Sequence, residues 1–322
     1  MKRFLAYKPS IEHYLTTFLG DREGTIYEPV EYIISLGGKR LRPALLIGTA
    51  EALGKEPDSV IHLAGAIELF HNFTLLHDDI MDEASLRRGK ETVHLKWNRD
   101  QAILSGDVMF ALSYELLLHE ESKNGREIMS IFTKTAEEVC IGQQLDMDFE
   151  KRDEVSAKEY LEMIRLKTSV LLGASAAMGA LAAGAHGEVV GAMYSYGMEL
   201  GLAFQIQDDI LDAFSETADM GKVPGGDILQ NKKTLLYIYA LEMAHEGQRA
   251  ALKRFYSQQG GSDEKVNGVR AIFKDTGSLD RVKELQVKYL QKAESSLREV
   301  SLPEEWNQEF LSMLEFQTER IK

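Results

Sequence analysis

Apolar residues along this chain recur mainly at three- and four-residue steps, the spacing of one face of an α-helix. In the segment YLEMIRLKTSVLL, for example, Leu161, Ile164 and Thr168 share such a face. We find no run of alternating β-branched residues bounded by turns. The long stretch between Pro57 and Pro224 has no proline and is rich in Ala, Leu, Met, Glu and Lys, which favours helix. The pattern predicts an all-α fold.

Boundary signals divide the chain into helical segments. Helix starts are predicted at Pro57-Asp58-Ser59 and at Ser156–Glu159, where a proline or a capping residue precedes the periodic pattern. Breaks are predicted at residues 20–24, 123–125, 152–155, 218–226 and 258–262. No internal repeat and no long linker is evident. We therefore expect one domain over residues 1–322.

One uncharged segment has the length of a membrane span. Residues 168–187 carry no Lys, Arg, Asp or Glu for 20 residues, close to what a bilayer core requires. The segment is rich in Ala, Gly and Ser, so its hydrophobicity is weak for insertion. We expect a buried, close-packed helix here and no stable membrane insertion.

Composition narrows the class of partner and the compartment. Lys and Arg number 37 and Asp and Glu number 51, which gives a net charge of −14. This charge argues against nucleic-acid binding and against a polybasic membrane patch. Cys140 is the single cysteine of the sequence, so an internal disulfide is not possible. A cytoplasmic location is expected.

Two acidic clusters with identical spacing stand behind apolar residues. They are Asp78, Asp79 and Asp82 in LLHDDIMDEASLRRG, and Asp208, Asp209 and Asp212 in FQIQDDILD. Residues four apart share a helix face. A single cluster could be a solvated helix face, but two matching copies in apolar contexts favour a shared chemical role. Mg²⁺ is the preferred candidate, because it binds a few carboxylates and completes its shell with water and phosphate oxygens.

Basic residues accompany both clusters and suit a phosphorylated substrate. The segment GGKRLRP at 37–43 and the pair Arg87-Arg88 lie near the first cluster in sequence; Lys167 lies mid-chain. Lys222 and Lys232-Lys233 follow the second cluster. Guanidinium and ammonium groups bind phosphate oxygens. For GGKRLRP alone, a turn before a helix with exposed charges is the favoured interpretation.

Taken in order, these motifs resemble those of the trans-prenyl diphosphate synthases. The resemblance covers residues 35–235, through GGKRLRP, HNFTLLHDDIMDEASLRRG, GQQLD, LKTS, FQIQDDILD, GKVPGGD and NKKT. It implies a single large helical bundle around a deep central cavity, the isoprenoid synthase type of fold, usually as a homodimer. It also implies prenyl transfer that depends on Mg²⁺, with three ions per active site.

The resemblance also assigns roles to individual residues. Those expected to bind metal are Asp78, Asp79, Asp82, Asp208, Asp209 and Asp212, with Asp78, Asp82 and Asp208 as the main ligands. Those expected to contact the allylic diphosphate are Arg87, Lys167, Lys222 and Lys232, and those expected to hold isopentenyl diphosphate are Lys39, Arg42, His71 and Arg88. Thr168 and Gln205 would lie near the developing carbocation.

The implied reaction joins an allylic diphosphate (dimethylallyl, geranyl or farnesyl) to isopentenyl diphosphate and releases diphosphate. Phe73, five residues before Asp78, resembles the bulky ring that closes the cavity floor in short-chain members, with Thr74 and Phe70 beside it. A product of twenty or fifteen carbons is expected. The alternatives are a longer-chain polyprenyl diphosphate synthase, a terpene cyclase or a non-catalytic partner subunit.

Overall fold

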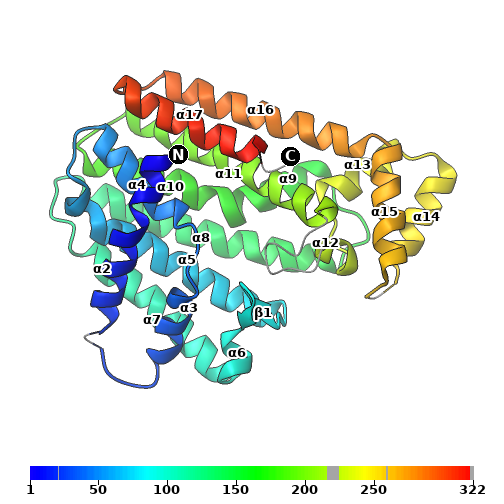
Figure 1. Cartoon of the computed structure of the whole chain (residues 1–322), viewed down its shortest axis with the longest axis horizontal. Helices are drawn as coiled ribbons and strands as arrows, with labels where there is room; N and C mark the ends of the chain where they lie inside the picture. The colour runs from blue at the N-terminus through cyan, green and yellow to red at the C-terminus, as the bar shows by residue number, and fades with distance from the viewer. Residues whose placement is uncertain (21, 216–224, 259, 320–322) are drawn as a thin grey trace. The chain divides into compact units, whose positions relative to one another are not determined.

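The computed structural model describes residues 1–20, 22–215, 225–258 and 260–319 (Figure 1), with side chains up to residue 316. Within these residues every regular element except one short hairpin is helical, which confirms the all-α prediction. The elements before residue 120 are α1 (Lys2–Ala6), α2 (Lys8–Gly20), α3 (Glu28–Ser35), α4 (Leu41–Ala52), the 3₁₀ turn η1 (Pro57–Val60), α5 (Ile61–Met81), β1 (Leu86–Arg87), β2 (Lys90–Glu91), α6 (Val93–Lys96) and α7 (Arg99–Leu117). The later elements are α8 (Gly125–Glu150), α9 (Ala157–Ile164), the π-helical turn η2 (Arg165–Ser169), α10 (Val170–Ala182), α11 (Glu188–Phe214), α12 (Gly226–Leu229), α13 (Leu235–Met243), α14 (Glu246–Tyr256), α15 (Asp263–Asp275), α16 (Ser278–Arg298) and α17 (Glu304–Glu319).

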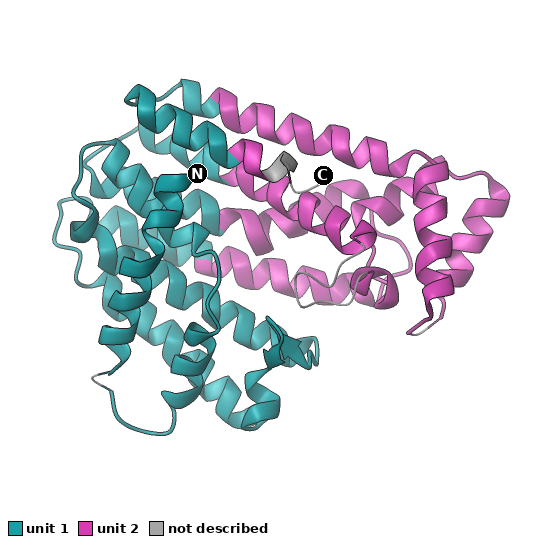
Figure 2. Ribbon diagram, in the orientation of Figure 1, with its two compact units in different colours: residues 1–135, 171–197, 296–313 teal, residues 136–170, 198–295, 314–322 magenta. Residues whose placement is uncertain are grey.

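The chain divides into two compact units, which are coloured separately in Figure 2. The first unit comprises residues 1–135, 171–197 and 296–313, and the second comprises residues 136–170, 198–295 and 314–322. Helices α8, α11, α16 and α17 contribute residues to both units. One domain over residues 1–322 stays a prediction, and each unit is described by itself.

The structure has helical elements at both of the helix starts that the sequence predicts. The turn η1 begins at Pro57 and runs into α5. Helix α9 begins after Ser156, whose hydroxyl accepts from the Glu159 N–H while the Glu159 carboxylate accepts from the Ser156 N–H. This reciprocal capping provides acceptors for the backbone N–H groups of Ser156 and Glu159. The predicted break at 218–226 lies mostly outside the described residues.

Most of the uncharged segment 168–187 forms a buried helix, as predicted. Helix α10 continues directly from η2, and each of its 13 residues is buried. The longer stretch Pro57–Met81 does pass a composition test for a span, with a mean hydropathy of 1.2, but 61% of that window is buried inside the structure. A helix that is apolar on all sides and mostly buried is typical of a core helix as well.

In the first unit, α5 and α7 pack closely. His77 on α5 donates from Nε2 to the Ile103 carbonyl oxygen on α7 at 3.2 Å. A Cβ at Gly106, one turn further along α7, would overlap the His77 imidazole. Glycine at position 106 therefore permits the close approach of the two helices, and the hydrogen bond fixes their register.

In the second unit, helices α9, α11, α13 and α15 share one hydrophobic core. Ile206, Leu235 and Phe273 are among its buried members. Phe273 comes from α15, whose buried residues show the three- and four-residue spacing. Leu235 comes from α13, in which six consecutive residues, Leu235–Ala240, are buried. This core fixes the elements that carry the second acidic cluster.

We predict opposite effects for two glycine substitutions in helices. Gly106→Ala is expected to lower the free energy of unfolding by about 1–3 kcal/mol, because its methyl group overpacks the contact with His77. Gly191→Ala in α11 is expected to raise it by roughly 0.5–1 kcal/mol, because alanine loses less backbone entropy on folding and its Cβ would meet nothing within 4 Å. Urea denaturation followed by circular dichroism measures both. A Gly106→Ala protein as stable as the unmodified chain would contradict the close packing of α5 on α7.

Candidate active site

The first acidic cluster lies at the C-terminal end of α5 in the first unit. Asp78 and Asp82 are one helical turn apart, and the Asp82 N–H donates to the Asp78 carbonyl oxygen at 2.8 Å. The C-terminal end of a helix carries partial negative charge, which adds to the charge of the carboxylates. This concentration of negative oxygen atoms suits a hard divalent cation.

The middle residue of this cluster, Asp79, is bound by Arg87 from β1. The guanidinium donates from Nε and Nη2 to both carboxylate oxygens, each at 2.7 Å. Burial raises the pKa of Asp79, and the hydrogen bonds from Arg87 oppose that rise. Two parallel bonds of this kind fix geometry as well as charge. The pair thus ties the hairpin to the end of α5, and it brings together two residues that were predicted to act separately on metal and on diphosphate.

The segment GGKRLRP forms the turn that starts α4. Gly38 and Arg40 have positive φ values of 133° and 51°, and a Cβ at Gly38 would lie 2.7 Å from Nη2 of Arg88. Arg40 is buried and donates to the Glu68 carboxylate and to the Ile34 carbonyl oxygen. Arg40 therefore holds the turn in place, a role that the run of basic residues in the sequence does not reveal.

A basic site surrounds His71 of α5. Arg42 Nη1 lies 3.2 Å from His71 Nε2, and Lys39 is exposed on the turn before α4. Burial, followed by the charges of nearby arginines, holds the pKa of His71 well below its usual range. The arginines are Arg42, Arg88, Arg87 and Arg40. Arg87 and Arg40 are paired with Asp79 and Glu68. The charges of Arg42 and Arg88 near the neutral imidazole make this part of the first unit suitable for an anion.

An aromatic cluster lies along α5 before the first aspartates. Phe73 packs against Phe110 of α7 at 5.2 Å between ring centroids and against Phe70 at 5.6 Å. Phe70 is fully buried and also contacts Phe132 of α8 at 5.3 Å. Thr74 donates its hydroxyl to the helix backbone, at the His71 carbonyl oxygen, at 2.8 Å. The predicted chain-length residues Phe73 and Phe70 therefore belong to a layered set of rings.

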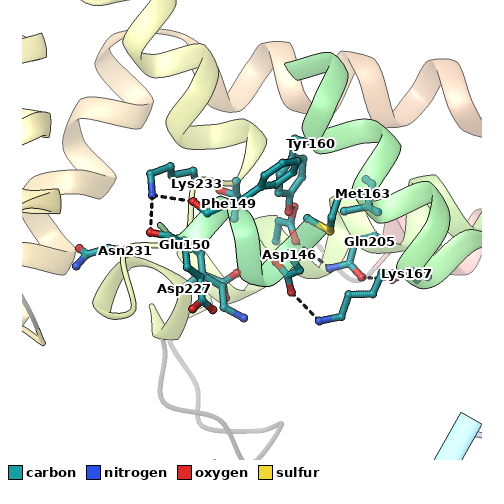
Figure 3. Close-up of a pocket in the computed structure, with 15 residues that line it drawn as sticks. Asp146, Phe149, Glu150, Tyr160, Met163, Lys167, Gln205, Asp227, Asn231 and Lys233 are labelled. Carbon is teal, nitrogen blue, oxygen red and sulfur yellow. Dashed lines mark hydrogen bonds and ion pairs between the residues drawn. The ribbon is translucent and has the colours of Figure 1, made fainter. Parts of the chain in front are cut away.

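A pocket in the second unit gathers most of the predicted residues from that part of the chain (Figure 3). Its lining includes Lys167, Thr168, Gln205, Asp209 and Lys232, all predicted from the sequence, together with Asp146, Tyr160, Asp227, Asn231 and Lys233. Lys222 lies outside the described residues. The pocket thus combines carboxylate, ammonium and amide groups at the ends of α8, α9 and α11.

The π-helical turn η2 presents Lys167 and Thr168 to this pocket. Lys167 Nζ donates to Asp146 Oδ2 at 2.6 Å, as Figure 3 shows. A Cβ at Gly142 of α8 would overlap the Lys167 backbone, so glycine is required where α8 passes this turn. Turns of π-helix inside α-helices frequently occur at functional sites.

A chain of hydrogen bonds crosses the pocket from Thr168 to Tyr160. The Thr168 hydroxyl donates to Gln205 Oε1 at 3.0 Å, and Gln205 Nε2 donates to Asp209 Oδ1 at 3.0 Å. Tyr160 donates to the other oxygen of Asp209 at 2.7 Å. Burial, and then the nearby charge of Asp227, raise the pKa of Asp209 well above its usual range. Asp209 is thus held by two neutral donors, and its carboxyl orients the amide of Gln205.

The remaining members of the second cluster lie along the last turns of α11. Asp212 accepts the Gly225 N–H at its carbonyl oxygen, at 2.7 Å, and the Asp227 N–H at Oδ2, at 2.8 Å. Asp208 lies one turn earlier on the same helix. Lys233 donates to the last carbonyl oxygens of α8, at Phe149 and Glu150. Lys233 is therefore a helix cap, and it lines the pocket together with its neighbour Lys232.

The functional residues that the sequence did not reveal are Tyr160 and Asp227. Tyr160 appears in the sequence as an ordinary apolar position of α9, and Asp227 as part of a glycine-rich turn. Their partners lie 49 and 15 residues away in the chain. No local spacing signals such contacts.

The donor atoms of both clusters fit Mg²⁺. Within the described parts of the chain, no group of three or more His, Cys, Asp or Glu side chains forms a ready-made metal cage. Mg²⁺ is usually held by one or two carboxylates together with waters and substrate phosphates, without such a cage. Asp78 with Asp82, and Asp208 on α11, supply hard oxygen atoms of this kind.

We predict that the basic site around His71 responds to a bound anion. Because its pKa is lowered, His71 is neutral at pH 7, and the folded state loses stability as the pH falls from about 6.5 towards the folded pKa. Inorganic diphosphate is expected to raise the pKa of His71, since it offsets the charge of the arginines. NMR titration of the imidazole with and without diphosphate measures this shift. Exposed His13 on α2 is the control, and equal responses of the two rings would contradict the prediction.

Comparison with known proteins gives one consistent result. The sequence model of the polyprenyl synthetase family matches residues 23–273. The chain is 43% identical to a geranylgeranyl diphosphate synthase of Methanosarcina mazei over 86% of this chain and 84% of that protein. It is 35% identical to a geranylfarnesyl diphosphate synthase of Aeropyrum pernix over 97% of this chain and 99% of that protein. A crystal structure of a geranylgeranyl pyrophosphate synthase superposes with a TM-score of 0.93, at 40% identity and covering 99% of each chain. The chain therefore belongs to the polyprenyl synthetase family and is a trans-prenyltransferase of isoprenoid biosynthesis.

Proposed function

We propose that the enzyme condenses an allylic diphosphate with isopentenyl diphosphate to give a short-chain, all-trans product of twenty or fifteen carbons. The observation that carries this proposal is the aromatic layer of Phe73, Phe70 and Phe110, which begins five residues before Asp78 on the same helix. An apolar chain that grows along α5 away from the aspartates meets this layer early. The geranylgeranyl and geranylfarnesyl names of the relatives support a product near this length.

The roles of the charged residues follow from their chemistry and from the family. Asp78, Asp82 and Asp208 would hold Mg²⁺, three ions per active site, with Asp212 assisting. Asp79 and Asp209 would act mainly by positioning, because Arg87 binds the first and Tyr160 and Gln205 bind the second. The allylic diphosphate would be bound by Arg87, Lys167, Lys222 and Lys232. Isopentenyl diphosphate would be bound by Lys39, Arg42, His71 and Arg88.

The proposed mechanism separates charge at the allylic C–O bond. Bound Mg²⁺ would supply positive charge to the departing diphosphate. Lys167 and Lys232 would stabilise the same oxygens, and Lys167 is already oriented by Asp146. The Thr168 hydroxyl donates a hydrogen bond to Gln205. This orientation leaves the lone pairs of the Thr168 oxygen available to stabilise the allylic cation. The double bond of isopentenyl diphosphate then attacks the cation, and the proton released goes to the departing diphosphate.

The enzyme is proposed to act as a homodimer in the cytoplasm. In the first unit, α7 exposes Ile103 and Leu104, whose relative exposures are 39% and 53%. Neighbouring apolar side chains that face solvent suit a contact with a second copy. Light scattering coupled to size-exclusion chromatography measures the mass of the assembly.

Loss of the metal ligands should abolish prenyl transfer. Asp78→Ala and Asp208→Ala are each expected to lower turnover by about a hundredfold or more, because the charge that builds on diphosphate loses its stabilisation. The assay incubates geranyl diphosphate with labelled isopentenyl diphosphate and Mg²⁺, and chromatography identifies the product. Asp58→Ala, an exposed aspartate in η1, is the matched control. A cyclic hydrocarbon without elongation would identify a terpene cyclase, and wild-type turnover in either variant would contradict the metal assignment.

The aromatic layer should determine product length. Phe73→Ala is expected to lengthen the product by at least one five-carbon unit, because the next ring, Phe70, lies one helical turn deeper, about 4.5 Å along the helix. Phe18→Ala on α2, where the ring stacks on Tyr14, removes a ring of the same size outside this layer. An unchanged product from Phe73→Ala would show that Phe73 does not form the floor.

A further inference from the structure

Helix α15 carries two basic residues for which the sequence suggests no role in prenyl transfer. Lys265 is 2% exposed, although lysine is rarely buried without an ionic partner. Its Nζ donates to Asn231 Oδ1 at 2.7 Å, to the Gly260 carbonyl oxygen at 2.8 Å and to the Gln258 carbonyl oxygen at 3.0 Å. The three donors of the ammonium group are therefore matched by three neutral oxygens.

The residue that Lys265 holds, Asn231, starts the segment NKKT. Asn231 has a positive φ of 59°, a conformation that costs energy in a residue other than glycine unless the surroundings hold it. Its Nδ2 also donates to the Gln258 carbonyl oxygen at 3.0 Å. Lys232, the next residue, lines the pocket of the second unit. The contact with Lys265 thus fixes the backbone turn from which Lys232 extends.

The second basic residue, Arg270, binds the C-terminal end of α11. Its Nε donates to the Ala213 carbonyl oxygen, and its Nη2 donates to the Ser215 carbonyl oxygen at 3.3 Å. The last carbonyl groups of a helix lack partners within the helix, and a cation there also interacts favourably with the helix dipole. Asp212 is in this same final turn of α11. Arg270 therefore opposes fraying at the turn that carries the second acidic cluster.

Between these two contacts, α15 also packs on the turn that leads into α12. A Cβ at Gly225 would lie 2.7 Å from Cγ1 of Val266, so Val266 packs closely on this turn. Gly225 has a φ of 78°. Gly225 in turn donates to the Asp212 carbonyl oxygen. One face of α15, formed by Lys265, Val266, Val269 and Arg270, thus contacts both segments that supply charged groups to this site.

We propose that Lys265 and Arg270 are positioning residues for prenyl transfer. Arg270 holds the end of α11 so that Asp208 and Asp212 bind the metal–diphosphate group, and Lys265 holds the turn at Asn231 so that Lys232 reaches the same diphosphate. Neither residue contacts substrate. This inference rests on the proposed function of the second acidic cluster and of Lys232.

The test compares Lys265→Met and Arg270→Met with the unmodified enzyme in the same elongation assay. Arg270→Met is expected to raise the Mg²⁺ concentration for half-maximal rate by about tenfold, and Lys265→Met is expected to raise KM for the allylic diphosphate by about tenfold, the effect of losing a hydrogen bond at a charged group. KM for isopentenyl diphosphate should change by less than about twofold, because its proposed residues lie in the first unit. Lys253→Met on α14, an exposed lysine, is the matched control.

Conservative variants separate positioning from general stability. Lys265→Arg and Arg270→Lys keep the charge and are expected to recover most of the lost affinity for Mg²⁺ and allylic diphosphate. If Lys265→Met does not fold, Asn231→Gly removes the amide acceptor, accommodates the positive φ and should raise the same KM. Lower melting temperatures with wild-type kinetic constants, or equal rises in KM for both substrates, would overturn the proposal. Absence of elongation activity in the unmodified enzyme would instead overturn the proposed function. The proposed function is supported if the unmodified enzyme is active and Asp208→Ala inactivates it.

Discussion

Electrostatic repulsion between carboxylates at the ends of two helices is the constraint on which the two acidic clusters depend. Helix α5 ends at the first acidic cluster, and α11 carries the second within its final turns. In both places carboxylates stand near the negative end of a helix dipole, which is unfavourable without compensating positive charge. The folded chain supplies part of that charge itself, through Arg87 at the first cluster and Arg270 at the end of α11. In the proposed function, Mg²⁺ bound at each cluster would supply further positive charge.

Within each cluster, the second aspartate makes side-chain contacts that its spacing in the sequence does not reveal. The second aspartate of each, Asp79 or Asp209, is bound by side chains from another element, namely Arg87 in one case and Tyr160 in the other. Spacing alone gives the three carboxylates of a cluster nearly equal status. In the structure, Asp79 holds the hairpin through Arg87. Asp209 orients the side-chain amide of Gln205.

The sequence was sufficient for the all-α class, the helix starts and the acidic clusters, because these follow from local periodicity and capping. The sequence could not predict which of two neighbouring basic residues is buried or bound by another part of the protein. Arg40 is buried against Glu68, while Lys39, beside it in the chain, is exposed. Lys232 and Lys233 line the same pocket, but Lys233 also binds the last carbonyl oxygens of α8. These differences arise from contacts between residues tens of positions apart, which no short window of sequence contains.

Close packing of helices links the charged end of α5 to its apolar part. Phe73 stands one turn before His77, and the ring of Phe73 lies 4.7 Å from the His77 imidazole. The same imidazole donates to α7 and occupies the space that Gly106 leaves open. Helix α5 itself fixes the distance of Phe73 and Phe70 from Asp78. The position of Phe110 in the aromatic layer depends on the register of α7 against α5. In the proposed reaction, product length would then depend on backbone packing that touches no substrate, so ring identity alone is an incomplete guide to the product.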